Sequence, residues 1–264
     1  MVVCTLGDVL LDVIVRLDSA LAPGDDAVAR TTLAPGGQAA NVAAWAAALG
    51  AEARIVAVLA RDDTGMLLRR ELGGRGVEVF GPPGERTGVV VSIVQPEGDR
   101  TMASDRGSAA DLEADDLDAA WFTCEVLHLS GYSLMRPPMG AAAERAAELA
   151  RERGARVSFD LSSWTHIERF GDVMRRALAR IRPDVVFGNE REWAAVGDVD
   201  AGARIVKRGP RGMTVDGAAH AAVPVDAVDS TGAGDALAAG YLVGGAELAL
   251  EAAARCVSQV GAMP

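Results

Sequence analysis

The segment from Asp229 to Asp235 combines residue types that could transfer a phosphoryl group. Gly232, Ala233 and Gly234 carry little side-chain bulk, so their backbone N–H groups can point at an anion where a helix begins. A carboxylate such as Asp235 would repel that anion, unless it takes a proton from an attacking hydroxyl. The same residues also suit an ordinary turn with helix caps, and taken alone the segment favours that turn.

The elements that must position this segment alternate between strands and helices. Short apolar runs are typical of buried strands of a parallel sheet, and amphipathic or alanine-rich runs are typical of helices between them. The predicted strands are 2–6, 54–60, 126–129, 157–159 and 185–187, and the predicted helices are 42–49, 64–73, 141–153, 170–180, 236–242 and 246–260. An acidic segment over 111–118 predicts a further helix start with a solvated face rather than a metal cluster.

Four strand-like segments lie outside this alternation. One surrounds Asp12, one covers 27–33, and two over 87–95 and 100–104 can form a hairpin across the turn 96–99. We expect these four segments, within 12–33 and 87–104, to form a small sheet that acts as a lid over a cleft.

The N-terminal part offers polar residues that could bind hydroxyl groups. Asp12 interrupts an apolar strand, where a charge is costly unless it faces solvent or a hydroxyl-rich ligand. Gly36 and Gly37 allow a close approach to the backbone, and Asn41 lies in the first turn of the next helix. Taken alone, Asp12 is better explained as a solvent-facing strand residue, and capping or turn formation explains Asn41 about as well as ligand binding does.

A second group of candidates follows the strand at 185–187. Asn189 and Glu192 are three residues apart, so a helix beginning there places both on one side, where they suit a hydrated Mg²⁺. A helix cap with a surface Glu is the alternative. Lys207, Gly209 and Gly212 follow a further apolar strand and could receive a polyphosphate, or form a basic hairpin turn.

Composition limits the partners. The chain has 264 residues, half of them hydrophobic, with a net charge of -11 and a pI near 4.8, which argues against nucleic-acid and anionic membrane surfaces. Its three cysteines are far apart in the sequence, and we expect them to lie in the core of a protein in the reducing cytoplasm. We also expect neither a secretion signal nor a membrane span. The sequence has no GxSxG, Walker A or complete Rossmann motif. Its three histidines do not have the spacing of a zinc site, and His128 lies in an apolar run, where we expect a core residue.

Together and in order, these segments resemble the ribokinase-like, or PfkB, family of carbohydrate and nucleoside kinases. The resemblance covers nearly the whole chain and is most specific at 229–235, followed by Gly36, Gly37 and Asn41. It implies one kinase domain over 1–264, built as a three-layer α/β/α core with a mainly parallel sheet and a small β lid. It also implies ATP and Mg²⁺ as cofactors, a small sugar or nucleoside as acceptor, and a homodimer formed through the lid.

The resemblance gives each candidate a role. Asp235 is the implied base that deprotonates a primary hydroxyl, and Gly232, Ala233 and Gly234 hold the transferring phosphoryl. The residues implied to bind the acceptor are Asp12, Gly36, Gly37 and Asn41. Those implied to bind the nucleotide are Lys207, Gly209, Gly212 and Thr231. Asn189 and Glu192 are implied to bind Mg²⁺ through water, and Asp229 a monovalent cation such as K⁺.

Two features depart from the family pattern. The interval between Asn189 and Gly209 is short, as though a helix had been lost, and the C-terminal segment is compressed. The main hypothesis is a kinase of ribose, fructose or a nucleoside. A binding protein with the same fold and impaired catalysis is an alternative, and a dinucleotide-binding enzyme is a weaker alternative. The sequence does not choose the acceptor.

Overall fold

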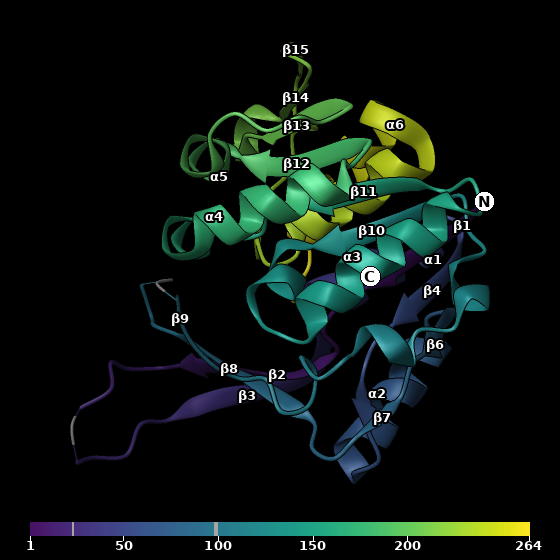
Figure 1. Ribbon diagram of the computed structural model, residues 1–264. Coiled ribbons are helices and arrows are strands. Elements are labelled where there is room, and N and C mark those ends of the chain that lie inside the picture. Colours follow the sequence, from purple (N-terminus) through teal and green to yellow (C-terminus); the bar gives the residue numbers. More distant parts are fainter. Residues whose placement is uncertain (23, 98–99) are drawn as a thin grey trace.

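A nine-stranded sheet forms the centre of the protein, in the order β15-β14-β13-β12-β11-β10-β1-β4-β6 (Figure 1). The computed structural model describes residues 1–22, 24–97 and 100–264. The strands are parallel except for β14 and β15, which add antiparallel at one edge. The bounds are β1 Val2–Leu6, β4 Glu52–Val56, β6 Val77–Phe80, β10 Val126–Ser130, β11 Arg156–Asp160, β12 Val185–Asn189, β13 Ala203–Lys207, β14 Met213–Val215 and β15 Ala218–His220.

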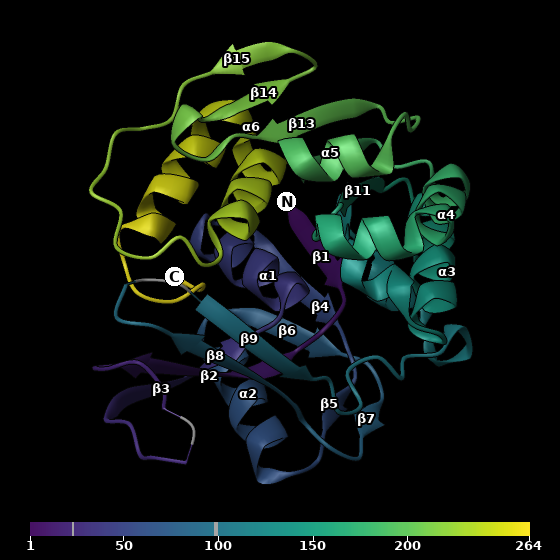
Figure 2. The same ribbon diagram turned by 90° about the vertical axis from the view of Figure 1, so that its left-hand side faces the viewer.

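Helices cover both faces of this sheet, because its central strands are apolar on both sides. In β1, Val3 packs into one core cluster while Cys4 and Leu6 pack into the other. Figure 2 shows α3, α4 and α5 on one side and α1 and α6 on the other. The helices are α1 Gln38–Ala48, α2 Asp63–Gly74, α3 Met139–Arg151, α4 Trp164–Ile181, α5 Glu190–Val196 and α6 Ala233–Val257, with short 3₁₀ turns η1 Ala114–Asp116, η2 Ala119–Phe122, η3 Gly131–Met135 and η4 Gly209–Arg211. The predicted three-layer α/β/α architecture is confirmed.

Helix α6 consists of two arms. Gly245 has non-helical dihedral angles, with φ 81°, and Gly240 in the first arm packs against Leu248 and Ala249 in the second. The two arms correspond to the helices predicted over 236–242 and 246–260. Among the helices of the described residues, α6 is the one long and apolar enough to qualify as a membrane span, but half of its most apolar window is buried inside the protein and the turn at Gly245 divides it.

A separate four-stranded sheet projects from the core, in the order β3-β2-β8-β9 (Figure 1). Its strands are β2 Leu10–Leu17, β3 Ala29–Gly36, β8 Gly88–Val94 and β9 Arg100–Asp105. Strand β9 pairs antiparallel with β8, as the predicted hairpin requires. Positions 98 and 99 of the predicted turn lie outside the described residues.

Three sequence predictions need correction. The predicted strand 54–60 is broken: β4 ends at Val56, and the chain leaves the main sheet to form β5 Leu59–Ala60, which pairs with β7 Pro83–Gly84. The predicted helix at 170–180 begins earlier, at Trp164, and Phe170 is the site of a kink. The acidic segment 111–118 forms 3₁₀ turns capped by its own carboxylates instead of an α-helix. Within the described ranges, no cluster of three or more potential metal ligands occurs there or elsewhere.

Candidate active site

Polar residues end four neighbouring parallel strands at one edge of the main sheet. Ser130 of β10 is in register with Asp160 of β11, and Asn189 of β12 is in register with Lys207 of β13. The carboxyl ends of parallel strands are where open α/β sheets bind ligands. The first turns of α1 and α6 supply Asn41 and Asp235 to the same place, since these two side chains are hydrogen-bonded.

Asp235 has the properties of a general base. It lies in the first turn of α6, after Gly232, which adopts the left-handed conformation with φ 78°. Its carboxylate accepts a hydrogen bond of 2.7 Å from the Asn41 side-chain amide. Burial raises the pKa of Asp235 to about 7, and the Asn41 hydrogen bond opposes this rise. A pKa close to neutral suits a group that must accept a proton during catalysis.

The glycine segment beside Asp235 is closely packed and faces a cation. A side chain on Gly232 would clash with Ala262, because the C-terminal tail folds back onto this turn. A Cβ on Gly234 would lie 3.2 Å from Nζ of Lys207. The structure therefore places the Lys207 ammonium next to the backbone of the predicted anion hole.

Lys207 is held by a buried carboxylate that the sequence analysis did not assign. Its Nζ donates a hydrogen bond of 2.7 Å to Asp160, whose side chain is fully buried. Burial acts to lower the pKa of Lys207, but Asp160 and Glu192 outweigh it, so the pKa is raised and the amine stays charged. Asp160 ends a strand that the sequence predicted, so its position at the sheet edge was available as a signal.

The predicted acceptor residues come together around the start of α1. A Cβ on Gly36 would overlap the carboxylate of Asp12, because β2 and β3 are adjacent in the lid sheet. Gly37 has φ 103° and packs against the backbone carbonyl of Asp8. Asn41 has its Oδ1 buried without a hydrogen-bond partner while its amide reaches Asp235. Asn41 thus joins the predicted acceptor residues to Asp235.

Gln38 is a further residue that the sequence analysis missed. Its Oε1 accepts hydrogen bonds from Ser130 and from Ser162, the latter at 2.6 Å. It also forms a side-chain hydrogen bond that lowers the pKa of Asp235. Ser162 itself has an unusual positive φ of 70°. Only its position between the glycine pair and Asn41 could have singled out Gln38, because the predicted helix began at residue 42 and the observed α1 begins at Gln38.

Asn189 and Glu192 form the reciprocal cap that the sequence left open as an alternative. The Asn189 side chain accepts from the Glu192 backbone at 2.9 Å, and Glu192 Oε2 accepts from the Asn189 backbone at 2.7 Å. The Asn189 amide also donates to Glu192 Oε1. Burial raises the pKa of Glu192, while the Lys207 charge lowers it.

The four-stranded sheet contacts the segment 229–235 through Arg16 of β2, which faces Asp229. Asp229 Oδ1 accepts from the backbone and hydroxyl of Thr231, and its Oδ2 accepts from the Gly261 backbone and faces the Arg16 guanidinium of β2 at 3.4 Å. The Thr231 hydrogen bonds lower the pKa of Asp229 despite partial burial. A cavity of about 500 Å³ lies between the lid and this loop, with Asp12, Arg16, Val90, Ser92, Asp229 and Thr231 in its lining.

The two glycines after β13 have different surroundings. A Cβ on Gly209 would meet nothing within 4 Å, whereas one on Gly212 would clash with the His220 carbonyl. Gly212 also has φ 83° and accepts a hydrogen bond from the Arg208 backbone. Gly212 therefore closes the hairpin, and Gly209 leaves backbone open to an approaching ligand.

The residues expected in the core are there. His128 is fully buried and bonds Ser158 at 2.9 Å, and burial lowers its pKa to about 4. Cys4, Cys124 and Cys256 are free and buried.

Comparisons with known proteins identify the family and agree with the fold. The model of the pfkB family of carbohydrate kinases matches residues 2–263. The ATP-dependent ribose-1-phosphate kinase of Halopiger xanaduensis is 32% identical, over 96% of this chain and 90% of that protein. An Escherichia coli fructokinase is 30% identical, over 92% of this chain and 83% of that protein. The crystal structure of adenosine kinase from Sinorhizobium meliloti superposes with a TM-score of 0.85 at 26% identity, covering 99% of this chain and 95% of that one.

The family match covers nearly the whole chain, and its relatives are named phosphotransferases. The chain belongs to the pfkB family of carbohydrate kinases.

Proposed function

We propose that this protein transfers the γ-phosphoryl group of ATP to a primary hydroxyl of a small sugar, with Asp235 as the base. The observation that carries the proposal is the Asn41–Asp235 hydrogen bond, because it joins an acceptor-binding residue to a carboxylate whose pKa is raised to about 7. At neutral pH such a carboxylate is ionised in a large fraction of molecules and can take the hydroxyl proton.

The remaining residues divide between the two substrates. Asp12, Gly36, Gly37 and Asn41 hold the hydroxyl groups of the acceptor, and Gly209, Gly212 and Thr231 hold the nucleotide. The backbone of Gly232, Ala233 and Gly234 and the ammonium of Lys207 stabilise the negative charge on the phosphoryl oxygens. In support, the Lys207 ammonium lies beside Gly234.

Asn189 and Glu192 fit a hydrated Mg²⁺ better than a directly bound one. Each already uses oxygens to cap α5, and oxygens that accept N–H groups keep lone pairs for metal-bound waters. When bound, Mg²⁺ neutralises charge on the phosphates of ATP. The protein residues orient its water shell.

Other acceptors belong to the same proposal. A nucleoside is the alternative, and relatives named adenosine kinase and aminoimidazole riboside kinase support it. A binding protein without catalysis is the alternative from another class. Its support is the single short helix α5 between β12 and β13.

An acceptor panel tests the proposal. The protein is incubated with Mg²⁺-ATP and, separately, ribose, fructose, ribose 1-phosphate, a 2-keto-3-deoxy sugar acid and adenosine, and ADP release is followed by a coupled assay. We expect acceptor-dependent ADP with one class of acceptor. Ligand-induced thermal shifts without ADP above the acceptor-free rate would instead identify a binding protein.

Assembly, cation and location complete the proposal. We propose a homodimer formed through the lid, supported by exposed Val28, Leu33 and Met102 on or beside its strands. Light scattering of the native protein and of Leu33→Asp tests it.

We propose a K⁺ site at Asp229, supported by the lowered pKa that keeps its carboxylate ionised. Initial rates in potassium chloride against choline chloride test it. We place the protein in the cytoplasm, in keeping with its free, buried cysteines.

A further inference from the structure

A second, smaller cavity lies between the root of the lid and the start of α4. Its volume is about 180 Å³, below the roughly 300–1,000 Å³ of cavities that enclose a whole ligand, so it suits one substituent of a larger molecule. The lining consists of three arginines, one histidine and two aromatic residues, and it contains no carboxylate. These residues are Arg106, Tyr132, Arg136, His166, Arg169 and Phe170.

The positive charge of this cavity is poorly balanced. Arg106 is paired with the buried carboxylate of Asp8 and lies over the Tyr132 ring at 5.2 Å. Arg136 and Arg169 are exposed and form no salt bridge among the described residues, although the Arg136 charge also lowers the pKa of Asp8 and Arg169 lies over the Phe170 ring. In a protein with a net charge of -11, three guanidinium groups that line one cavity, of which only Arg106 is seen paired with a carboxylate among the described residues, mark a local site for an anion.

His166 shows that the three guanidinium groups converge. Its Nδ1 is buried and has no hydrogen-bond partner. Its pKa is lowered first by burial and then by the charges of Arg106, Arg136 and Arg169. A neutral His166 can offer one ring N–H to an anion, in addition to the guanidinium donors.

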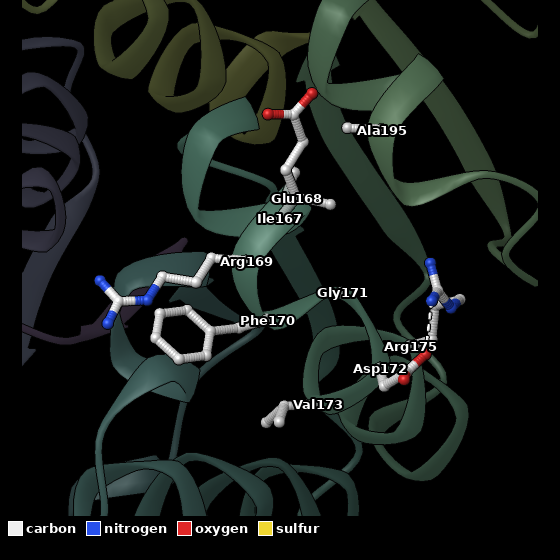
Figure 3. Close-up of a pocket in the computed structure, with 9 residues that line it drawn as sticks. All are labelled: Ile167, Glu168, Arg169, Phe170, Gly171, Asp172, Val173, Arg175 and Ala195. Carbon is white, nitrogen blue, oxygen red and sulfur yellow. Dashed lines mark hydrogen bonds and ion pairs between the residues drawn. The ribbon is translucent and has the colours of Figure 1, made fainter.

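One side of the neighbouring helix contributes to this cavity. Figure 3 shows Arg169 and Phe170 extending to one side of α4, while Asp172 and Arg175 form an ion pair on the other side. The kink in α4 lies at Phe170, between Arg169 and the ion pair of Asp172 and Arg175. Arg169 is therefore directed away from the carboxylate that neutralises Arg175.

The cavity is connected to the acceptor site by hydrogen bonds. The Tyr132 backbone donates to Ser130 Oγ at 3.2 Å, and Ser130 donates to Gln38, three residues before Asn41. The pKa of Tyr132 is raised mainly by burial, and the charges of Asp235 and Asp160 add to that rise while Arg106 opposes it. Tyr132 therefore lines the arginine cavity and also senses the charges of Asp235 and Asp160.

We propose that the acceptor carries an anionic group, a phosphate or a carboxylate, in addition to its reacting hydroxyl, and that Arg106, Arg136 and Arg169 bind this group. The proposal rests on the proposed kinase function. Guanidinium groups bind both kinds of anion through paired hydrogen bonds, and the ribose 1-phosphate named for the Halopiger relative is one member of this class. Neutral ribose, fructose and adenosine lack the group that the cavity would hold.

Kinetics with matched acceptors test the proposal. kcat/KM is measured for ribose 1-phosphate, for a 2-keto-3-deoxy sugar acid and for ribose, with the native protein, Arg136→Gln, Arg169→Gln and the control Arg70→Gln, whose exposed side chain lies on α2. We expect an anionic acceptor to be preferred, and the ratio of its kcat/KM to that of ribose to fall about 10–100-fold in each cavity variant, mainly through KM. The control should keep the native ratio, and the better of the two anions identifies phosphate or carboxylate.

Binding measurements separate the two proposals. Calorimetric titration with ribose 1-phosphate and with the sugar acid should show binding to the native protein and the Arg70→Gln control, and at least a tenfold weaker binding to Arg136→Gln. If no acceptor gives ADP but this arginine-dependent binding is present, the kinase function fails and the anion site stands. If a neutral sugar or nucleoside is the preferred acceptor and the cavity variants keep the native ratio, the anion site is wrong and the kinase function stands. Unchanged thermal midpoints of the variants exclude unfolding as the cause.

Discussion

The side-chain amide of Asn41 donates a 2.7 Å hydrogen bond to the carboxylate of Asp235, joining the first turns of two helices that are 194 residues apart in the sequence. The bond holds the carboxylate beside the predicted acceptor residues and favours its ionised form. If Asp235 is the base, as proposed, a change at Asn41 alters both the acceptor site and the pKa of the base.

Replacing Asp235 with Asn should remove the base while preserving its shape. We expect kcat to fall about 10²–10⁴-fold, the usual contribution of a positioned base, with ATP affinity changed less than threefold. Rates from ADP release and nucleotide titration by calorimetry measure the two quantities. A variant with native turnover would show that another group takes the proton.

The activity should depend on the ionisation of Asp235. Because the base acts as a carboxylate and its pKa in the folded protein is about 7, kcat/KM should be low at pH 5.5, rise about tenfold per pH unit, and level off above pH 7. The Asn41 hydrogen bond lowers this pKa, so Asn41→Ala should move the rise to higher pH. An unmoved midpoint in Asn41→Ala, or a native profile that is flat between pH 5.5 and 8, would refute this origin of the pH dependence.

Gly36 should tolerate no side chain, because a Cβ there would overlap the Asp12 carboxylate. Gly36→Ala should raise the acceptor KM about tenfold or more while the KM for ATP stays within twofold. Gly73→Ala is the matched control, since a Cβ at Gly73 meets nothing within 4 Å and alanine favours the helix. Equal effects of the two substitutions on acceptor KM would mean that the contact with Asp12 is unimportant.

Lys207 and Asp160 should stabilise the fold only as a pair. Lys207→Met leaves the fully buried Asp160 without its partner, so we expect the free energy of unfolding to fall by about 3 kcal/mol. The double variant Lys207→Met/Asp160→Leu should recover most of this loss but not the activity, because the cation beside Gly234 is absent. Urea denaturation at pH 7 gives the free energies. Additive losses in the double variant would contradict the pairing.

The residue order along the chain was enough to predict the architecture. Apolar runs such as the one at Val3 and Cys4 predicted buried parallel strands alternating with helices, and the strands near Asp12 and Arg100 predicted a separate small sheet. The family resemblance added the arrangement of the helices in two layers around the main sheet. Boundaries were less accurate. The break after Val56 depends on pairing between β5 and β7, and the early start of α4 depends on packing, so neither has a local signal.

The sequence by itself determined the candidates whose roles depend on local chemistry: the glycine turn before Asp235, the cap formed by Asn189 and Glu192, and the glycine pair before α1. The tertiary structure alone decided which side chains meet. Asn41 with Asp235, Lys207 with Asp160, and the arginines around His166 come from distant segments, and sheet register and helix packing bring them together. Short-range patterns cannot encode such distances, because they depend on how strands order in the sheet and on which face each helix packs.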